Sequence, residues 1–308
     1  MAAYRVLAFD GGGILGLLSA VILRRLLAKR PGMLAGIDLL AGTSTGGIIA
    51  LAVAFGVPVD EIITLYREKG RRIFDDSWLD DLRDLGGLTG ADYDSQRLKS
   101  ELTRVFGTAR LRDLRGRRVL VAAFDLDNLD RVPRPGEVRH WKPKFFHNFP
   151  GSDSDGAESI VDVAMRTSAA PTYFPSYQGF IDGGVVANNP SLAAVAQALD
   201  SRAGAQVLGD IRLLSLGTGR SPTFVSGQRH DWGYAAWGKQ LVRIMIDGVM
   251  GVADFQCTQL LGSRYHRLDP WLPEAIDLDD VDKAERIVEI AESIDIRATV
   301  RWLEEQRF

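Results

Sequence analysis

Short, predominantly apolar runs alternate along this chain with longer segments in which apolar positions recur every three or four residues. The short runs cover residues 4–9, 37–41, 118–124 and 211–216, and each is followed by glycine or aspartate. Such runs are typical of strands buried on both faces, and the longer segments predict helices. Strands that alternate with helices predict a three-layer α/β/α fold built on a mainly parallel central sheet.

The predicted helices share an apolar stripe and end at glycine, proline or polar clusters. We expect them at residues 14–27, after Ser44, at 59–69, 94–106 and 158–168, after Pro190, at 234–261 and, as one or two helices, at 281–306.

Two segments fit no regular element. Residues 71–88 carry large apolar side chains among aspartates and arginines, which predicts either a surface helix or a flap over the site that meets lipid. Residues 125–157 are rich in Asp, Pro and Gly and interleave basic with aromatic residues, a pattern found at nucleic-acid contacts. Because the run is short and the chain is not basic, we interpret it as a packed functional loop.

The composition is that of an ordinary globular protein, with 308 residues of which 46% are hydrophobic and 25% are charged. The formal net charge of −3 gives no bulk attraction to nucleic acid or to an anionic membrane. The single cysteine cannot form an internal disulfide, and neither a signal peptide nor a transmembrane stretch is evident. We expect one domain over residues 1–308 in a cytoplasmic protein, peripheral at membranes.

The apolar run at 37–41 meets Gly-Thr-Ser-Thr-Gly at residues 42–46, and a second apolar run follows directly. A Gly-x-Ser-x-Gly pattern between strand and helix is typical of a nucleophile elbow, a tight turn that exposes the serine hydroxyl at a helix N-terminus. Ser44 is therefore the candidate nucleophile. The alternative is a glycine-rich turn with a solvated serine.

A second glycine turn follows the first strand, directly after Asp10. Ligand sites in parallel sheets lie beyond the carboxyl ends of the strands, so this turn is expected beside the elbow. The backbone amides of Gly11, Gly12 and Gly13 are suited to an oxyanion hole. The turn also matches the Gly-x-Gly-x-x-Gly of dinucleotide-binding folds, which place an acidic residue at the end of the second strand. Here Asp38 lies at the start of that strand instead.

The sequence marks the general base less clearly. In a Ser–Asp–His order the histidine comes last, which points to His266, yet none of the four histidines follows a buried strand at a glycine turn. A carboxylate that hydrogen-bonds the serine could replace the histidine, because burial raises its pKa. Asp182 is the candidate, although Asp-Gly between apolar runs is also a common hairpin turn. Asp10 is expected to hold the glycine loop by hydrogen bonds.

Four motifs follow one another along the chain, at residues 10–16, 42–47, 168–174 and 182–184. They read Asp-Gly-Gly-Gly-x-x-Gly, Gly-Thr-Ser-Thr-Gly-Gly, Ser-Ala-Ala-Pro-Thr-Tyr-Phe and Asp-Gly-Gly, and in this order they resemble the patatin-like phospholipase family. Two later segments resemble further blocks of that family, so the resemblance covers most of the chain. These segments are residues 214–219 and 265–269.

The resemblance implies a Ser–Asp dyad, carried here by Ser44 and Asp182, with the loop from Gly11 to Gly13 as oxyanion hole. It also implies hydrolysis of acyl ester bonds in lipids through an acyl-enzyme, without a metal or a cofactor. The chain departs from the family at Leu15, where many relatives carry a basic residue that would orient the loop or the lipid phosphate.

We therefore expect a lipid acyl hydrolase of the phospholipase A or esterase type, acting on a lipid at a membrane surface. One alternative is an acyltransferase on the same scaffold, which would favour an alcohol over water as acceptor. Another is a nucleotide-binding module that uses the glycine loop. Nucleic acid is not an expected partner, and the sequence leaves open whether an activating ligand or protein switches the enzyme on.

Overall fold

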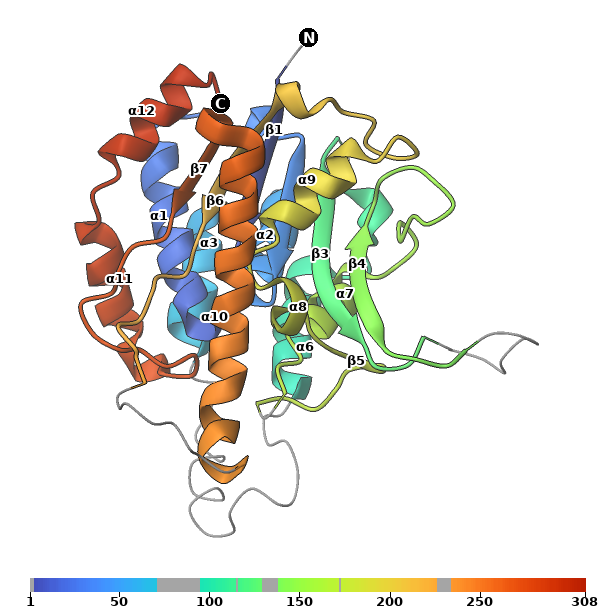
Figure 1. The fold of residues 1–308 in the computed structure, drawn as a ribbon, viewed down its shortest axis with the longest axis vertical. Coiled ribbons are helices and arrows are strands. Elements are labelled where there is room, and N and C mark those ends of the chain that lie inside the picture. Colours follow the sequence, from blue (N-terminus) through green and yellow to red (C-terminus); the bar gives the residue numbers. More distant parts are fainter. Residues whose placement is uncertain (1–2, 71–94, 115, 129–137, 172, 226–233) are drawn as a thin grey trace.

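The structure is a computed structural model that describes residues 3–70, 95–114, 116–128, 138–171, 173–225 and 234–308 (Figure 1). The predicted flap or surface helix at 71–88 lies outside these residues. Within them, a central sheet is covered by helices on both faces, and this arrangement confirms the predicted three-layer α/β/α fold.

The sheet is mainly parallel. Five strands run parallel in the order β3-β2-β1-β6-β7, and β4 and β5 both pair antiparallel with β3. The predicted strands at 4–9 and 211–216 are confirmed residue for residue. The strands are β1 (Tyr4–Phe9), β2 (Leu39–Thr43), β3 (Arg118–Asp125), β4 (Lys142–His147), β5 (Phe180–Asp182), β6 (Ile211–Leu216) and β7 (Tyr265–Leu268).

Each face of the sheet packs on its own apolar cluster. Leu7 and Phe9 of β1 point to one face, and Val6 and Ala8 point to the other. All four side chains are fully buried, which explains why the strand shows no polar alternation. The first face is covered by α1 (Gly16–Lys29), α2 (Thr45–Phe55), α3 (Val59–Thr64), α6 (Ser95–Phe106), α7 (Ile160–Thr167), α11 (Ala284–Ser293) and α12 (Arg297–Glu305). The second face is covered by α9 (Ser191–Leu199) and α10 (Tyr234–Leu261), and α8 (Gly184–Ala187) follows β5.

The interpretation of residues 125–157 as one long loop is wrong. The segment contains β4, which pairs with β3 from Leu120 opposite His147 to Asp125 opposite Lys142. β4 lies at the end of the sheet order, so one side of its backbone has no partner strand among the described residues. Lysine and proline at the exposed start of the strand suit such an edge, because they oppose pairing with another chain. That same composition resembles a loop when it is read from the sequence.

The register of β3 sets the position of the candidate site. β2 pairs with β3 only as far as Thr43 opposite Ala122, and β5 continues along that side of β3 with Asp182 opposite Ala123. β4 occupies the other side of the same β3 residues, so β2 and β5 meet end to end. Asp182 thus comes next in line after Thr43, where the chain turns at Ser44. The predicted hairpin alternative for Asp182 is wrong, because β5 leads into α8.

A close approach between α2 and β1 generates a test of this packing. A β-carbon added to Gly46 would lie 2.3 Å from the carbonyl oxygen of Phe9 and 2.5 Å from that of Asp10. We expect Gly46→Ala to lower the free energy of unfolding by about 1–3 kcal/mol, although alanine is the better helix former. Gly209→Ala is the matched control, because nothing lies within 4 Å of its added carbon. Equal denaturation midpoints for the two variants would contradict the close approach.

Candidate active site

Ser44 lies in a strained turn between β2 and α2. Its φ of 55° and ψ of −125° are unfavourable for a residue with a side chain, and strain of this kind is often stored at functional sites. The backbone amide of Ser44 donates to the hydroxyl of Thr167 at 2.8 Å, and that hydroxyl donates to the carbonyl of Ala122. A β-carbon on Gly42 would lie 2.2 Å from the carbonyl oxygen of Gly46, so the turn leaves no room for larger residues.

Asp182 ends β5 with its carboxylate turned toward the serine. The Ser44 hydroxyl lies within reach of this carboxylate and lowers its pKa, and the amide of Gly184 donates to its Oδ1 at 2.7 Å. The side chain is buried, and burial raises the pKa of Asp182 to about 6 although both of these neighbours oppose the shift. The structure therefore brings the two sequence-predicted residues into direct contact.

The glycine loop lies against the same serine. A β-carbon on Gly11 would be 3.3 Å from the Cβ of Ser44. The amide of Gly11 donates to the backbone carbonyl of Asn188 at 3.0 Å, and its own carbonyl accepts from Thr218 Oγ1 at 3.0 Å. The amides of Gly12 and Gly13 make no hydrogen bond to any residue that the structure describes. The first glycine thus anchors the loop, and the next two leave their donors free.

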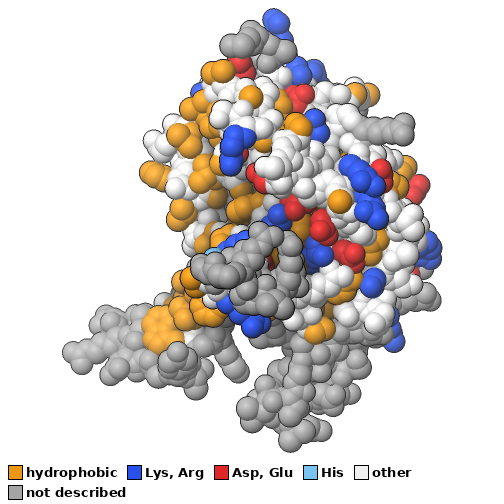
Figure 2. Space-filling view, turned by 90° about the vertical axis from the view of Figure 1, so that its right-hand side faces the viewer, with side chains coloured by type: hydrophobic (Ala, Val, Ile, Leu, Met, Phe, Trp, Pro, Cys, Tyr) orange, Lys and Arg blue, Asp and Glu red, His pale blue; other side chains and the backbone are white. Residues whose placement is uncertain are grey.

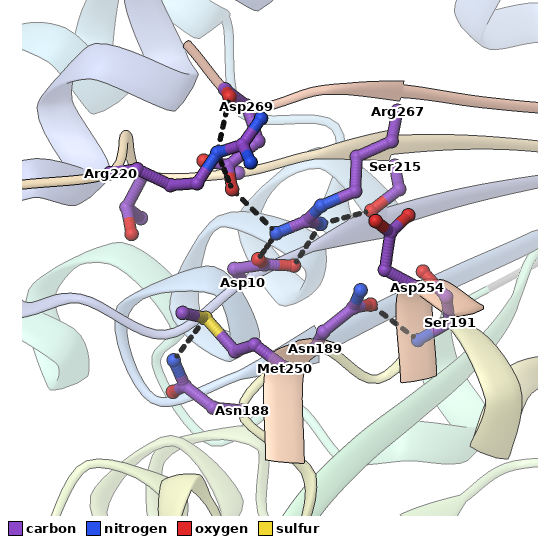
Figure 3. A network of polar contacts seen from close by, with 12 residues as sticks. Asp10, Asn188, Asn189, Ser191, Ser215, Arg220, Met250, Asp254, Arg267 and Asp269 are labelled. Carbon is purple, nitrogen blue, oxygen red and sulfur yellow. Dashed lines mark hydrogen bonds and ion pairs between the residues drawn. The ribbon is translucent and has the colours of Figure 1, made fainter. Parts of the chain in front are cut away.

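A buried ion pair fixes the residue before the loop (Figure 3). The guanidinium of Arg267, on β7, donates to both carboxylate oxygens of Asp10 at 3.2 and 2.6 Å. It also donates to Ser215 Oγ at 2.8 Å and to Asp269 Oδ2 at 2.9 Å. Burial alone would lower the pKa of Arg267, but the two carboxylates raise it above its ordinary value. The Asp10 carboxylate therefore bonds Arg267, and no hydrogen bond from it to the glycine loop is seen among the described residues, unlike the expectation from the sequence.

The three histidines that the structure describes lie apart from this site. His266 Nε2 is 2.9 Å from Thr299 Oγ1, and its ring stacks on Trp302 with centroids 5.4 Å apart. Of the three histidines that the structure describes, none hydrogen-bonds Ser44 or Asp182; His230 lies outside the described residues. Asp38 is likewise distant from the glycine loop, since its Oδ2 accepts from the amide of Arg5 at the amino end of the sheet. No acidic side chain of β2 is placed to hold a ribose.

The family model described as patatin-like phospholipase matches residues 7–195, more than half of the chain. This chain belongs to the patatin-like phospholipase family. Membership of this family supports lipid ester hydrolase activity.

Individual relatives match this chain over most of its length. The CotR protein of Bacillus subtilis (strain 168) is 32% identical, and the match covers 99% of this chain and 98% of CotR. A cGAMP-activated phospholipase of Pseudomonas aeruginosa is 34% identical, with 86% of this chain and 78% of that protein covered. Among solved structures, the ExoU–SpcU complex of Pseudomonas aeruginosa matches with a TM-score of 0.49 and 16% identity, over 99% of this chain and 52% of that chain.

Several residues that shape the patatin-like site carry no obvious signal in the sequence. The hydroxyl of Thr167 accepts from the amide of Ser44 and holds the turn there. The backbone carbonyl of Asn188 and the hydroxyl of Thr218 bond the amide and the carbonyl of Gly11 and hold the glycine loop. Arg267 places a cation beside Asp10, the residue before the glycine loop, whereas Leu15 is buried in the core. Only the position of Arg267 within the segment 265–269 could have drawn attention to it.

Two features are absent from the residues that the structure describes. No group of three His, Cys, Asp or Glu side chains there is arranged as metal ligands would be. Among the described helices, none combines the length and the apolar character that crossing a bilayer requires.

The buried pair of Asp10 and Arg267 generates a stability prediction. We expect Arg267→Met to lower the free energy of unfolding by about 3–5 kcal/mol, because it leaves buried carboxylates without their cation. The double variant Asp10→Asn/Arg267→Met should recover part of this loss in chemical denaturation. Arg297→Met removes an exposed pair with Asp295 and serves as the control, with an unchanged midpoint. An unchanged denaturation midpoint in Arg267→Met as well would contradict the role of Arg267 as the cation that neutralises buried carboxylates.

Proposed function

We propose that this chain hydrolyses acyl ester bonds of membrane lipids, with Ser44 as nucleophile and Asp182 as general base. The single observation that carries the proposal is that strand pairing places the buried carboxylate of Asp182 next to Ser44, close enough for the hydroxyl to lower its pKa. A serine hydroxyl is a weak nucleophile until a positioned base removes its proton. A carboxylate with a pKa of about 6 is a stronger base than an exposed one and is still ionised at neutral pH.

In the first half-reaction, Asp182 accepts the Ser44 proton while Ser44 Oγ attacks the ester carbonyl. The tetrahedral intermediate collapses, the ester C–O bond breaks, and the proton on Asp182 passes to the departing alcohol or lysolipid. In the second half-reaction, Asp182 takes a proton from water, which attacks the acyl-enzyme. The fatty acid leaves and the proton returns to Ser44.

We assign the oxyanion hole to the amides of Gly12 and Gly13, with Gly11 as the anchor of the loop. The Gly11 amide is engaged by Asn188, so it is not available to the substrate without a rearrangement. A β-carbon on Gly12 would lie 2.4 Å from Thr218 Oγ1, so the backbone of the loop packs too closely on Thr218 for a residue with a side chain. The N-terminus of α2, directly after Ser44, adds a favourable dipole for the developing negative charge.

We expect Ser44→Ala and Asp182→Asn each to lower kcat on a soluble ester by about 10⁴-fold while retaining the wild-type circular dichroism spectrum. His266→Ala should keep its activity and is the matched control, because His266 contacts Thr299 rather than the site. Fluorophosphonate should label the wild type at Ser44, and mass spectrometry should identify the fatty acid released from a lipid panel. Adding an alcohol acceptor separates hydrolysis from acyl transfer.

One relative is named a cGAMP-activated phospholipase, so these assays include a wild-type sample with cGAMP. Activity that persists in Asp182→Asn and is lost in His266→Ala would refute the dyad. Nucleotide binding without fluorophosphonate labelling would favour the nucleotide-binding alternative.

The raised pKa of Asp182 predicts the pH dependence of the reaction. The base must be ionised, so kcat/KM should rise with pH to a plateau, with a midpoint near 6 and about a tenfold fall per unit below it. The measurement is a pH–rate profile on a soluble ester. A profile that stays flat between pH 5 and 8 would contradict the assignment.

The raised pKa of Asp182 also predicts how the stability of the folded protein depends on pH, which can be measured without an activity assay. Because the pKa of Asp182 is higher in the folded state than its ordinary value of 3.8, its contribution to stability is present below about pH 4 and is lost as the pH rises through 6. Asp182→Asn avoids burying the charge. It should therefore be more stable than the wild type at pH 8, by on the order of 1–3 kcal/mol, with no gain below pH 4.

A further inference from the structure

The long helix α10 exposes an apolar face. Leu241, Ile244, Met245, Val252 and Phe255 are between 43% and 64% exposed. At 3.6 residues per turn they lie within about 60° of Leu241 around the helix axis, over a length of about 21 Å. We call these five residues the apolar face of α10. In Figure 2, hydrophobic side chains gather along the left-hand edge, which is the side that faces the viewer in Figure 1, where α10 lies in front of the sheet.

The charged residues of the same stretch are placed elsewhere on the helix. Arg243, Asp247 and Asp254 fall about 120–160° from Leu241 around the helix axis and so lie outside the apolar face. Asp247 is the nearest to it, at about 60° from Ile244. Arg243 pairs with Asp277 at 3.6 Å, and Asp254 accepts a hydrogen bond from Tyr265. The apolar face is therefore free of charge, which is unusual for so long a stretch of exposed surface.

The opposite side of α10 contacts the candidate active site. Asn188 Nδ2 donates to the sulfur of Met250 at 3.0 Å (Figure 3). The backbone carbonyl of Asn188 accepts from the amide of Gly11 and so anchors the glycine loop. The 28 residues of α10 span about 42 Å, whereas the six-residue strands span about 20 Å. The helix leads at its C-terminus into β7, so its N-terminal half extends past the carboxyl edge of the sheet, where Ser44 lies (Figure 1).

We propose that the apolar face of α10 docks on the surface of a lipid bilayer and brings the site to its substrate. The inference rests on the proposed function, because membrane lipids are the substrate assigned there. A second copy of the chain is the less suitable occupant. A strip about 21 Å long and about 10 Å wide covers about 200 Å², far below the roughly 800 Å² that each partner of a stable complex buries. A bilayer needs only these few side chains to insert.

The test is flotation of the full chain with phosphatidylcholine vesicles. The double variant Ile244→Asp/Val252→Asp should lower the vesicle partition coefficient about tenfold or more, because it places two charges where apolar groups insert. Val207→Asp is the matched control, since Val207 is also exposed, at 54%, but is not part of the apolar face of α10, and its partitioning should equal that of the wild type. Both variants should hydrolyse a soluble short-chain ester at the wild-type rate, which reports an intact fold and site.

Three results would overturn the docking proposal: no vesicle binding by the wild type, unchanged binding in the double variant, or binding that requires anionic lipid. A wild-type dimer that the double variant dissociates in sedimentation would also overturn it and assign the face to self-association. Ser44→Ala separates the two proposals, because it should bind vesicles like the wild type. If the wild type binds through α10 but hydrolyses no ester, the proposed function fails and the docking surface stands.

Discussion

The site depends on the strand β3 being longer than its neighbour β2. One side of β3 pairs first with β2 and then with β5, so two strands from distant parts of the chain meet end to end. At that junction the turn after Thr43 lifts Ser44 toward Asp182. Hydrogen-bonded strand pairing fixes both backbones and so holds the two side chains close together. Little conformational entropy then remains to be lost when they react.

Two aspartates at this edge of the sheet have similar burial and different surroundings. Burial raises the pKa of both Asp10 and Asp182 to about 6. Both carboxylate oxygens of Asp10 accept hydrogen bonds from Arg267, so a permanent cation lies where a proton would bind. Among the described residues, the partners of the Asp182 carboxylate are a serine hydroxyl and a backbone amide, and neither is a permanent cation. The neighbours of each carboxylate, rather than its burial, separate a positioning residue from a proposed base.

The glycines of the site serve the same arrangement. The turn at Ser44 and the loop at Gly11 press against each other and against Asn188 and Thr218, with no space for further side chains. The strain at Ser44 persists because the packed core on both faces of the sheet over-determines the backbone. On the outer side, α10 closes this crowded region with Met250 while its other face stays exposed and apolar.

The sequence by itself determined the elements, because periodicity and turn chemistry act between near neighbours. It predicted β1, β6 and α10 with their observed bounds, and the glycines around Ser44 indicated a tight turn. The edge strand β4 was missed, because its lysines and proline resemble a loop until its pairing with β3 is known. The resemblance to a family named Ser44 and Asp182 as partners, but only the tertiary structure decided that they touch, that Asn188 occupies the Gly11 amide, and that Arg267 neutralises Asp10. These contacts join segments that are far apart in the chain, and they follow from strand register, which no local pattern encodes.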